Sequence, residues 1–177
     1  MATPVHVPGH VARHDPAVHH CVRAVASGVV ERCDAAALYA CFRDFGGWTR
    51  WMASTPFVLL GDSRGTEVGA LRNVVFSDTK NLLERLDAID DGARSVTYSG
   101  VNYGYSSGAP GGGGAYPLSA SPFPGSFIDY TSTVRVWRIS VRPEGAPPAA
   151  FMEWSGEVWT EGNKVGEMRD FLSAFYR

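Results

Sequence analysis

The chain has 177 residues, of which 45% are apolar and 12% aromatic, with a formal net charge of −2. This length and composition predict one domain with its own core and exclude a disordered chain. Because 16 basic and 18 acidic side chains form no basic stripe, we expect no nucleic acid partner. The apolar runs are too short for a membrane span, and the first residues lack the apolar region of a secretory signal.

The three cysteines, Cys21, Cys33 and Cys41, are an odd set in a chain large enough to fold without disulfides. We therefore predict free, buried thiols and a cytoplasmic location, with organelle targeting by residues 1–20 left open. No histidine is placed to activate Cys33 or Cys41 as a nucleophile. The oligomeric state cannot be predicted from the sequence.

Residues 1–20 contain three prolines and all five histidines without an apolar period, which predicts a flexible tail before a domain over 22–177. His6, His10 and His14 recur every four residues, as helical metal ligands would. Pro4, Pro8 and Pro16 oppose a helix in this segment. We therefore expect no metal, and no motif in the chain calls for a cofactor.

A strand is expected over residues 22–32, followed by a helix that Asp34 caps and that runs to residue 45. A second short helix over 48–54 is closed by Pro56. The expected buried stripe of the first helix consists of Leu38, Cys41, Phe42 and Phe45.

Further segments have strand character, and short turns join most of them. They cover residues 57–62, 67–76, 81–90, 93–103, 127–141 and 150–161. From Asn163 onward, apolar residues recur at helical spacing. The predicted class is therefore α+β: a curved antiparallel sheet of about seven strands around a long C-terminal helix, with two short helices after the first strand.

Side chains alternate across a strand, so even and odd positions lie on opposite faces. The even positions are mostly apolar and include Val68 and Ala88, whereas the odd positions, such as Asn73 and Asp129, suit water. We predict that the even face points inward and forms a cavity. The site residues expected on it are Arg72, Phe76, Glu84, Tyr98, Tyr130, Ser132, Met152 and Trp154.

Four of these inward residues, Arg72, Glu84, Tyr98 and Tyr130, are charged or carry hydroxyls. Burying an unpaired charge is costly, so they need partners or water. One interpretation is a cavity for a small apolar or amphipathic molecule. The other is a structural ion pair inside an ordinary core, with the tyrosine hydroxyls bonded to the backbone.

Several short motifs occur in order along the chain. They are Asp34, Asp44-Phe45, Trp48, Trp51, Gly69 with Arg72, Glu84 with Leu86, Asp90-Asp91, Tyr98, Asp129-Tyr130 and Trp154. With the order of elements, they resemble the START-like superfamily, which includes the Bet v 1-like proteins and the polyketide cyclase/dehydrase group. The resemblance covers residues 22–177 and implies a helix-grip fold that binds a hydrophobic or secondary-metabolite-like molecule.

The layout is similar to that of the lachrymatory factor synthases, in which an arginine and a glutamate on neighbouring strands handle a sulfenic acid. Arg72 and Glu84 occupy the matching positions. Arg72 would stabilise an oxyanion and Glu84, with a pKa raised by burial, would transfer protons in a cofactor-free lyase, isomerase or cyclase reaction. The alternative is a non-catalytic carrier or sensor gated by residues 103–126. Nothing beyond the breadth of the superfamily favours a third, partner-dependent role.

Overall fold

The computed structural model describes residues 14–52, 55–77, 80–101 and 127–176. The expected gate over residues 103–126 and the first 13 residues of the expected tail lie outside the described residues. The elements are β1 (His19–Glu31), α1 (Ala35–Arg43), the 3₁₀ helix η1 (Gly47–Arg50), β2 (Phe57–Leu59), β3 (Leu71–Ser77), β4 (Lys80–Asp90), β5 (Ser95–Gly100), β6 (Phe127–Arg138), β7 (Ala149–Glu161), the 3₁₀ helix η2 (Gly162–Lys164) and α2 (Val165–Phe175).

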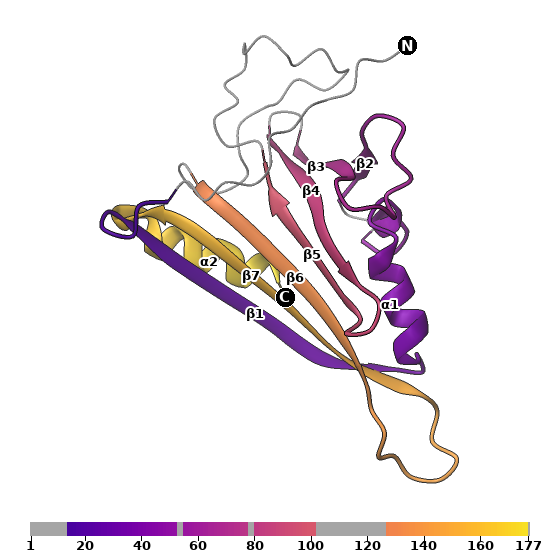
Figure 1. Ribbon diagram of the computed structural model, residues 1–177. Coiled ribbons are helices and arrows are strands. Elements are labelled where there is room, and N and C mark those ends of the chain that lie inside the picture. Colours follow the sequence, from indigo (N-terminus) through magenta and orange to yellow (C-terminus); the bar gives the residue numbers. More distant parts are fainter. Residues whose placement is uncertain (1–13, 53–54, 78–79, 102–126, 177) are drawn as a thin grey trace.

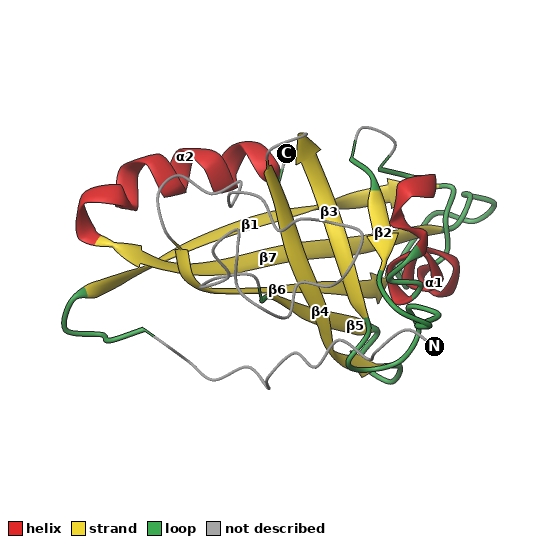
Figure 2. Cartoon of the chain, turned by 90° about the horizontal axis from the view of Figure 1, so that it is seen from above, coloured by secondary structure: helices red, strands yellow, loops and turns green. Residues whose placement is uncertain are grey.

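The strands form one antiparallel sheet in the order β1-β7-β6-β5-β4-β3-β2, so that β1 and β2 are its edges (Figure 1). Helix α2 packs on β1 and β7, whereas α1 packs on β5, β6 and β7. The two helices lie at opposite ends of the curved sheet (Figure 2). This arrangement confirms the predicted α+β helix-grip fold.

Helix α1 begins where predicted, because the Asp34 carboxylate accepts hydrogen bonds from the backbone N–H of Ala36 and Ala37, both at 2.8 Å. Its buried residues are Ala35, Leu38, Tyr39 and Phe42.

The prediction that Cys41 is buried is wrong: its side chain is exposed, because at about 100° per residue it lies to one side of this stripe. The cysteines are all free, as expected, but Cys21 and Cys33 are only half-buried.

The second helix is shorter than expected, a single 3₁₀ turn over Gly47–Arg50. Thr49 redirects the chain, since its hydroxyl accepts a hydrogen bond from the Phe57 N–H at 3.0 Å and donates to the Phe57 carbonyl at 3.3 Å. Trp48 is fully buried, and its indole N–H donates to the Phe42 carbonyl at 3.0 Å. The tryptophan therefore fixes the turn against the end of α1.

Side-chain alternation places the inward face correctly, with two local exceptions. Val68 is 60% exposed because β3 begins only at Leu71. Ala88 is exposed because a bulge between Leu86 and Ala88 shifts the register with β5, so that Ile89 packs against the core instead.

The outward face is less wet than predicted. Asn73 and Asp129, expected in water, are both buried. The Asn73 side-chain oxygen accepts a hydrogen bond from the Asn81 amide at 2.7 Å. The Asp129 carboxylate lies 2.7 Å from the ring nitrogen of His14, and that ring stacks on Trp159 with centroids 3.7 Å apart. Ordered structure therefore begins before the expected boundary at residue 22.

The closing helix α2 has 11 residues. At 1.5 Å per residue it is about 16 Å long, whereas the 13-residue strand β7 spans about 44 Å. Helix α2 is therefore less than half as long as this strand. It leaves part of the inward face uncovered, although α1 packs on β7 as well.

Candidate functional site

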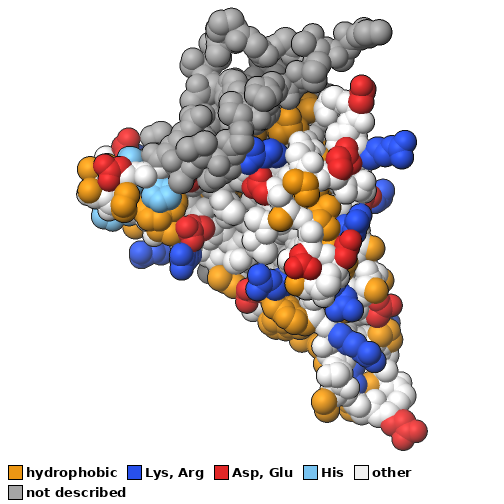
Figure 3. All heavy atoms as spheres, viewed as in Figure 1, with side chains coloured by type: hydrophobic (Ala, Val, Ile, Leu, Met, Phe, Trp, Pro, Cys, Tyr) orange, Lys and Arg blue, Asp and Glu red, His pale blue; other side chains and the backbone are white. Residues whose placement is uncertain are grey.

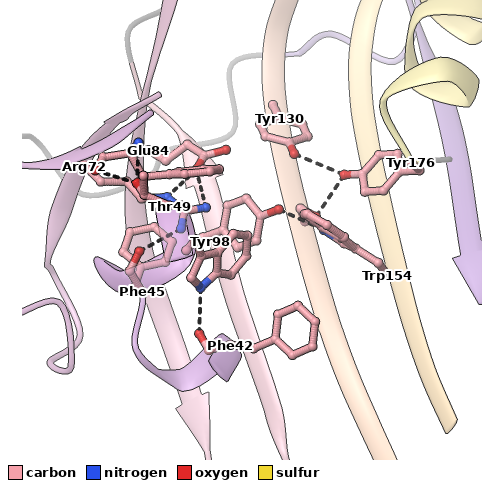
Figure 4. A network of polar contacts seen from close by, with 12 residues as sticks. Phe42, Phe45, Thr49, Arg72, Glu84, Tyr98, Tyr130, Trp154 and Tyr176 are labelled. Carbon is pink, nitrogen blue, oxygen red and sulfur yellow. Dashed lines mark hydrogen bonds and ion pairs between the residues drawn. The ribbon is translucent and has the colours of Figure 1, made fainter. Parts of the chain in front are cut away.

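Arg72 on β3 and Glu84 on β4 are direct cross-strand partners, so their side chains lie on the same, inward face. The Arg72 Nη2 and Nε atoms lie 2.6 and 2.7 Å from Glu84 Oε2. Only 1% and 2% of the two side chains are exposed. Figure 4 shows the two side chains pointing toward one another. The sequence left open whether this pair faces a cavity or lies inside the core, and in the structure it lies inside the core.

Aromatic rings from four segments enclose this ion pair. The guanidinium carbon of Arg72 lies 3.7 Å from the ring centroid of Phe45, 3.8 Å from that of Trp48, 4.5 Å from that of Phe57 and 5.1 Å from that of Tyr98. Its Nη1 atom donates to the Phe45 carbonyl at 2.8 Å. Ion pairing, hydrogen bonding and cation–π contacts thus compensate the charge.

Burial raises the pKa of Glu84 above its ordinary value, and the charge of Arg72 opposes that rise. Burial likewise lowers the pKa of Arg72, and Glu84 opposes that change. Desolvation is the larger cause in both. The pKa shifts of the pair are those expected of an acid and a base in an active site, but neither side chain is accessible to solvent.

A second polar network lies next to the ion pair and is centred on Trp154. Its indole N–H donates to the Tyr98 hydroxyl at 2.8 Å and to the Ser132 hydroxyl at 2.9 Å. The Tyr176 hydroxyl lies 2.9 Å from that of Ser132 and 3.0 Å from that of Tyr130 (Figure 4). The hydroxyls of Tyr98 and Tyr130 therefore have side-chain partners, whereas the second interpretation expected partners on the backbone.

Burial keeps these phenols neutral. It raises the pKa of Tyr98 and Tyr130 well above the ordinary value of 10.0, and that of Tyr176 to about 12. Sequence reasoning missed Tyr176, although its position four residues after Leu172 continues the apolar stripe of the closing helix. In the structure the Tyr176 hydroxyl lies against Gly156, where any side chain would collide with it.

Half-exposed apolar side chains surround Trp154 on the inward face, between the two helices. Trp51 and Phe175 lie on its two sides, with ring centroids 6.3 and 6.2 Å from that of Trp154. The Phe175 ring is also 5.9 Å from that of Phe76 on β3. We call the following residues the concave patch: Ala26, Gly28, Trp51, Phe76, Met152, Trp154, Phe171 and Phe175.

The β1 side of the concave patch is open. On β1, Gly28 is the cross-strand partner of Met152 and Ala26 is that of Trp154. A Cβ atom added to Gly28 would have no neighbour within 4 Å. The small side chain of Ala26 and the absent one of Gly28 therefore leave space above this part of the sheet.

The structure separates the expected site residues into three groups. Arg72 and Glu84 lie in the aromatic enclosure. Tyr98, Tyr130 and Ser132 belong to the hydrogen-bonded network, and Trp154 joins that network to the concave patch. The predicted ligand-binding residues that lie on the concave patch itself are Phe76, Met152 and Trp154.

A trough of about 430 Å³ lies on the opposite, outward face, where the sequence predicted none. It is lined by Arg23, Ala24, Val25, Thr131, Thr133, Ser155, Gly156 and Glu157.

Among the residues that the structure places, no three metal-ligating side chains come together. None of the helices in the described ranges has the length and apolar character that crossing a bilayer requires.

No protein-family model matches the chain, and no curated protein matches it in sequence. Solved structures do match. A protein of Nitrosospira multiformis is 19% identical, with 88% of this chain and 97% of that one covered and a TM-score of 0.56. A protein of Bacillus thuringiensis is 18% identical, with coverages of 88% and 90% and a TM-score of 0.59. These two similarities show a shared fold. A point mutant of Thalictrum flavum norcoclaurine synthase in complex with a transition-state analogue matches with 12% identity, coverages of 89% and 96%, and a TM-score of 0.49.

Proposed function

We propose that the protein binds a small apolar or amphipathic molecule on the concave patch and releases it unchanged. The observation that carries this proposal is the contrast between the two kinds of inward residue. The polar groups are bonded to one another and buried, whereas Trp51, Met152 and Phe175 remain partly exposed. A contiguous apolar surface of this kind is typical of a ligand or partner site.

The short closing helix supports the same proposal. A helix of about 16 Å cannot cover a strand of about 44 Å, so α2 leaves part of β7 to α1 and to the concave patch between the two helices. On the neighbouring strand β1, a Cβ atom added to Gly28 would have no atom within 4 Å. A bound molecule would take the place that a longer helix would otherwise fill.

The hydrogen bonds of Trp154 favour an occupant that binds through apolar contact. The Trp154 indole N–H already has two acceptors, so it offers no free donor to a ligand. Affinity must then come from apolar area, and micromolar binding, about 8 kcal/mol, requires roughly 300 Å² buried at 25 cal/mol per Å². We expect an aromatic or polycyclic molecule with a dissociation constant in the micromolar range or weaker, because association itself has an entropic cost.

Titration with anilinonaphthalene sulfonate, an apolar fluorescent probe, tests this proposal. Gly28→Trp fills the open space and should abolish the fluorescence increase. Val29→Trp is the matched control, because the adjacent side chain is 53% exposed on the other face and should leave binding unchanged. Equal affinity in wild type and Gly28→Trp, with both proteins folded by circular dichroism, would refute the proposal.

Acid–base catalysis by Arg72 and Glu84 is the second candidate function, and the raised pKa of Glu84 favours it. It requires the aromatic enclosure to open so that a substrate reaches the carboxylate. Native mass spectrometry of the purified protein would identify a retained compound, and incubation with that compound would reveal turnover. Loss of turnover in Glu84→Gln with unchanged affinity would favour catalysis over binding alone.

A further inference from the structure

Strand β1 is a long edge strand that lacks most of the features that protect edge strands against pairing, although it carries the charged residues Arg23 and Glu31. It has 13 residues and pairs with β7 without a break, from His19 opposite Glu161 to Glu31 opposite Ala149. Its sequence contains no proline and no lysine, and its register contains no bulge. Edge strands of natural proteins normally carry one of these features or are short.

The other edge of the sheet is protected. Strand β2 has three residues and follows Pro56 directly. Helix α2 lies behind the sheet, and β1 is the outermost strand in Figure 1. Within the described ranges, no backbone hydrogen bond outside the helices and strands involves residues 20–31. Among the residues that the structure places, none therefore occupies the outer edge of β1, which can accept another strand.

The sequence of β1 is complementary to itself. If two copies pair antiparallel about Ser27, residues whose numbers sum to 54 face each other: Arg23 faces Glu31 of the second copy, and Val25 faces Val29. Ser27 then faces its own copy. The five side chains of Arg23, Val25, Ser27, Val29 and Glu31 all point outward and are exposed. Moving the centre by one residue in either direction breaks the Arg–Glu and Val–Val matches while preserving the faces.

We propose that two copies of this chain associate through the free edges of β1 and form one continuous sheet. The twofold arrangement is isologous, so each matched pair occurs twice. It does not depend on the proposed ligand, which lies on the inward face.

The charges around the edge favour this partner. Arg23 lies 2.7 Å from Glu157 of its own chain and remains 75% exposed, and Glu31 lies 2.7 Å from Arg142 and remains 59% exposed. In the pair, each Arg23 meets Glu31 of the second copy, so that acidic and basic groups alternate across the junction. Basic and hydrophobic side chains lie along this margin of the molecule in Figure 3.

The apolar residues of the outward face continue across the same junction. Val25 and Val29 are 61% and 53% exposed. Val29 is the cross-strand partner of Phe151, which is in turn that of Trp137, and the two rings lie 5.5 Å apart. Pairing about Ser27 would bring this apolar row against Val25 of the second copy and shield both.

Sedimentation velocity on the full chain, with complementary charge reversals, tests the proposal. Wild type should sediment as a dimer at micromolar concentrations, and Arg23→Glu or Glu31→Arg should raise the dimer dissociation constant about tenfold or more, because each places like charges opposite one another twice. An equimolar mixture of the two variants should restore dimers, since each introduced glutamate then faces an introduced arginine. Arg64→Glu, an exposed change before β3, is the matched control and should sediment as wild type.

A wild-type chain that remains monomeric at every concentration would overturn the proposal and leave the edge for a strand of another protein. Dimers that persist unchanged in both variants would place the interface elsewhere and overturn it as well. A mixture that stays monomeric, with both variants folded by circular dichroism, would contradict the register about Ser27.

Discussion

Arg72→Met is the substitution that most sharply tests the buried ion pair. It removes the partner 2.6 Å from Glu84, the bond to the Phe45 carbonyl and the cation–π contacts. Leaving one charge of a buried pair uncompensated costs about 3–5 kcal/mol, a large part of a typical stability of about 5–15 kcal/mol. Urea unfolding, followed by the fluorescence of the five tryptophans, should show a loss of this size at pH 7.

The pH dependence of Arg72→Met has a defined sign. Without its counterion, Glu84 has a folded-state pKa raised further above the ordinary value of 4.5 by burial. A raised carboxyl pKa contributes stability that is present below 4.5 and lost as pH rises through the folded-state value. The variant should therefore be closest to wild type near the acid end of the measurable range and fall behind toward pH 8.

Two further variants control this experiment. Arg72→Met with Glu84→Met removes both charges and should be more stable at pH 7 than Arg72→Met alone. Arg43→Met breaks an ion pair to Asp91 whose side chains are 38% and 62% exposed, and should cost much less stability than Arg72→Met. The reasoning is refuted if Arg72→Met loses no more than Arg43→Met, or if the double variant is no more stable than Arg72→Met.

Two other predictions concern the core beside Trp154. Gly156→Ala should lower the free energy of unfolding in urea by about 1–3 kcal/mol, because the added methyl group collides with the Tyr176 hydroxyl. Gly28→Ala meets no atom and should cost much less. Equal losses in the two variants would contradict this packing. Raising the pH from about 10 to about 12 should lower the free energy of unfolding, because tyrosines ionise near 10.0 in the unfolded chain but Tyr176 does so at about 12 and Tyr98 and Tyr130 well above 10.0 when folded. Tyrosinate absorbance that reaches the value for all seven tyrosines while the protein is still folded would contradict this burial.

The inward placement of Arg72 and Glu84 could be predicted from the sequence because alternation along a strand is a local property. The exposure of Ala88 could not, because the bulge beside it depends on how β4 pairs with β5. Cys41 was misplaced for a related reason. Several apolar residues on α1 fit a helical stripe, and contact with the sheet decides which of them is buried.

The character of the site depended on contacts between distant segments. Phe45, Trp48 and Phe57 enclose Arg72 only because η1 and β2 fold back beside β3. Sequence spacing alone therefore left open whether Arg72 and Glu84 are accessible or enclosed, and the structure has an enclosed pair. The concave patch likewise combines Trp51 after η1 with Phe175 at the end of α2, residues more than a hundred positions apart that share Trp154 as a neighbour.

Amide chemical shifts measured by NMR during titration with anilinonaphthalene sulfonate test the binding account most directly. We predict that the largest shifts fall on Ala26, Gly28 and Met152, which lie on the concave side of β1 and β7. Residues that line the outward trough, such as Thr133 and Ser155, should remain unperturbed. Shifts concentrated on the trough, or none on the concave side at saturating probe, would contradict the account.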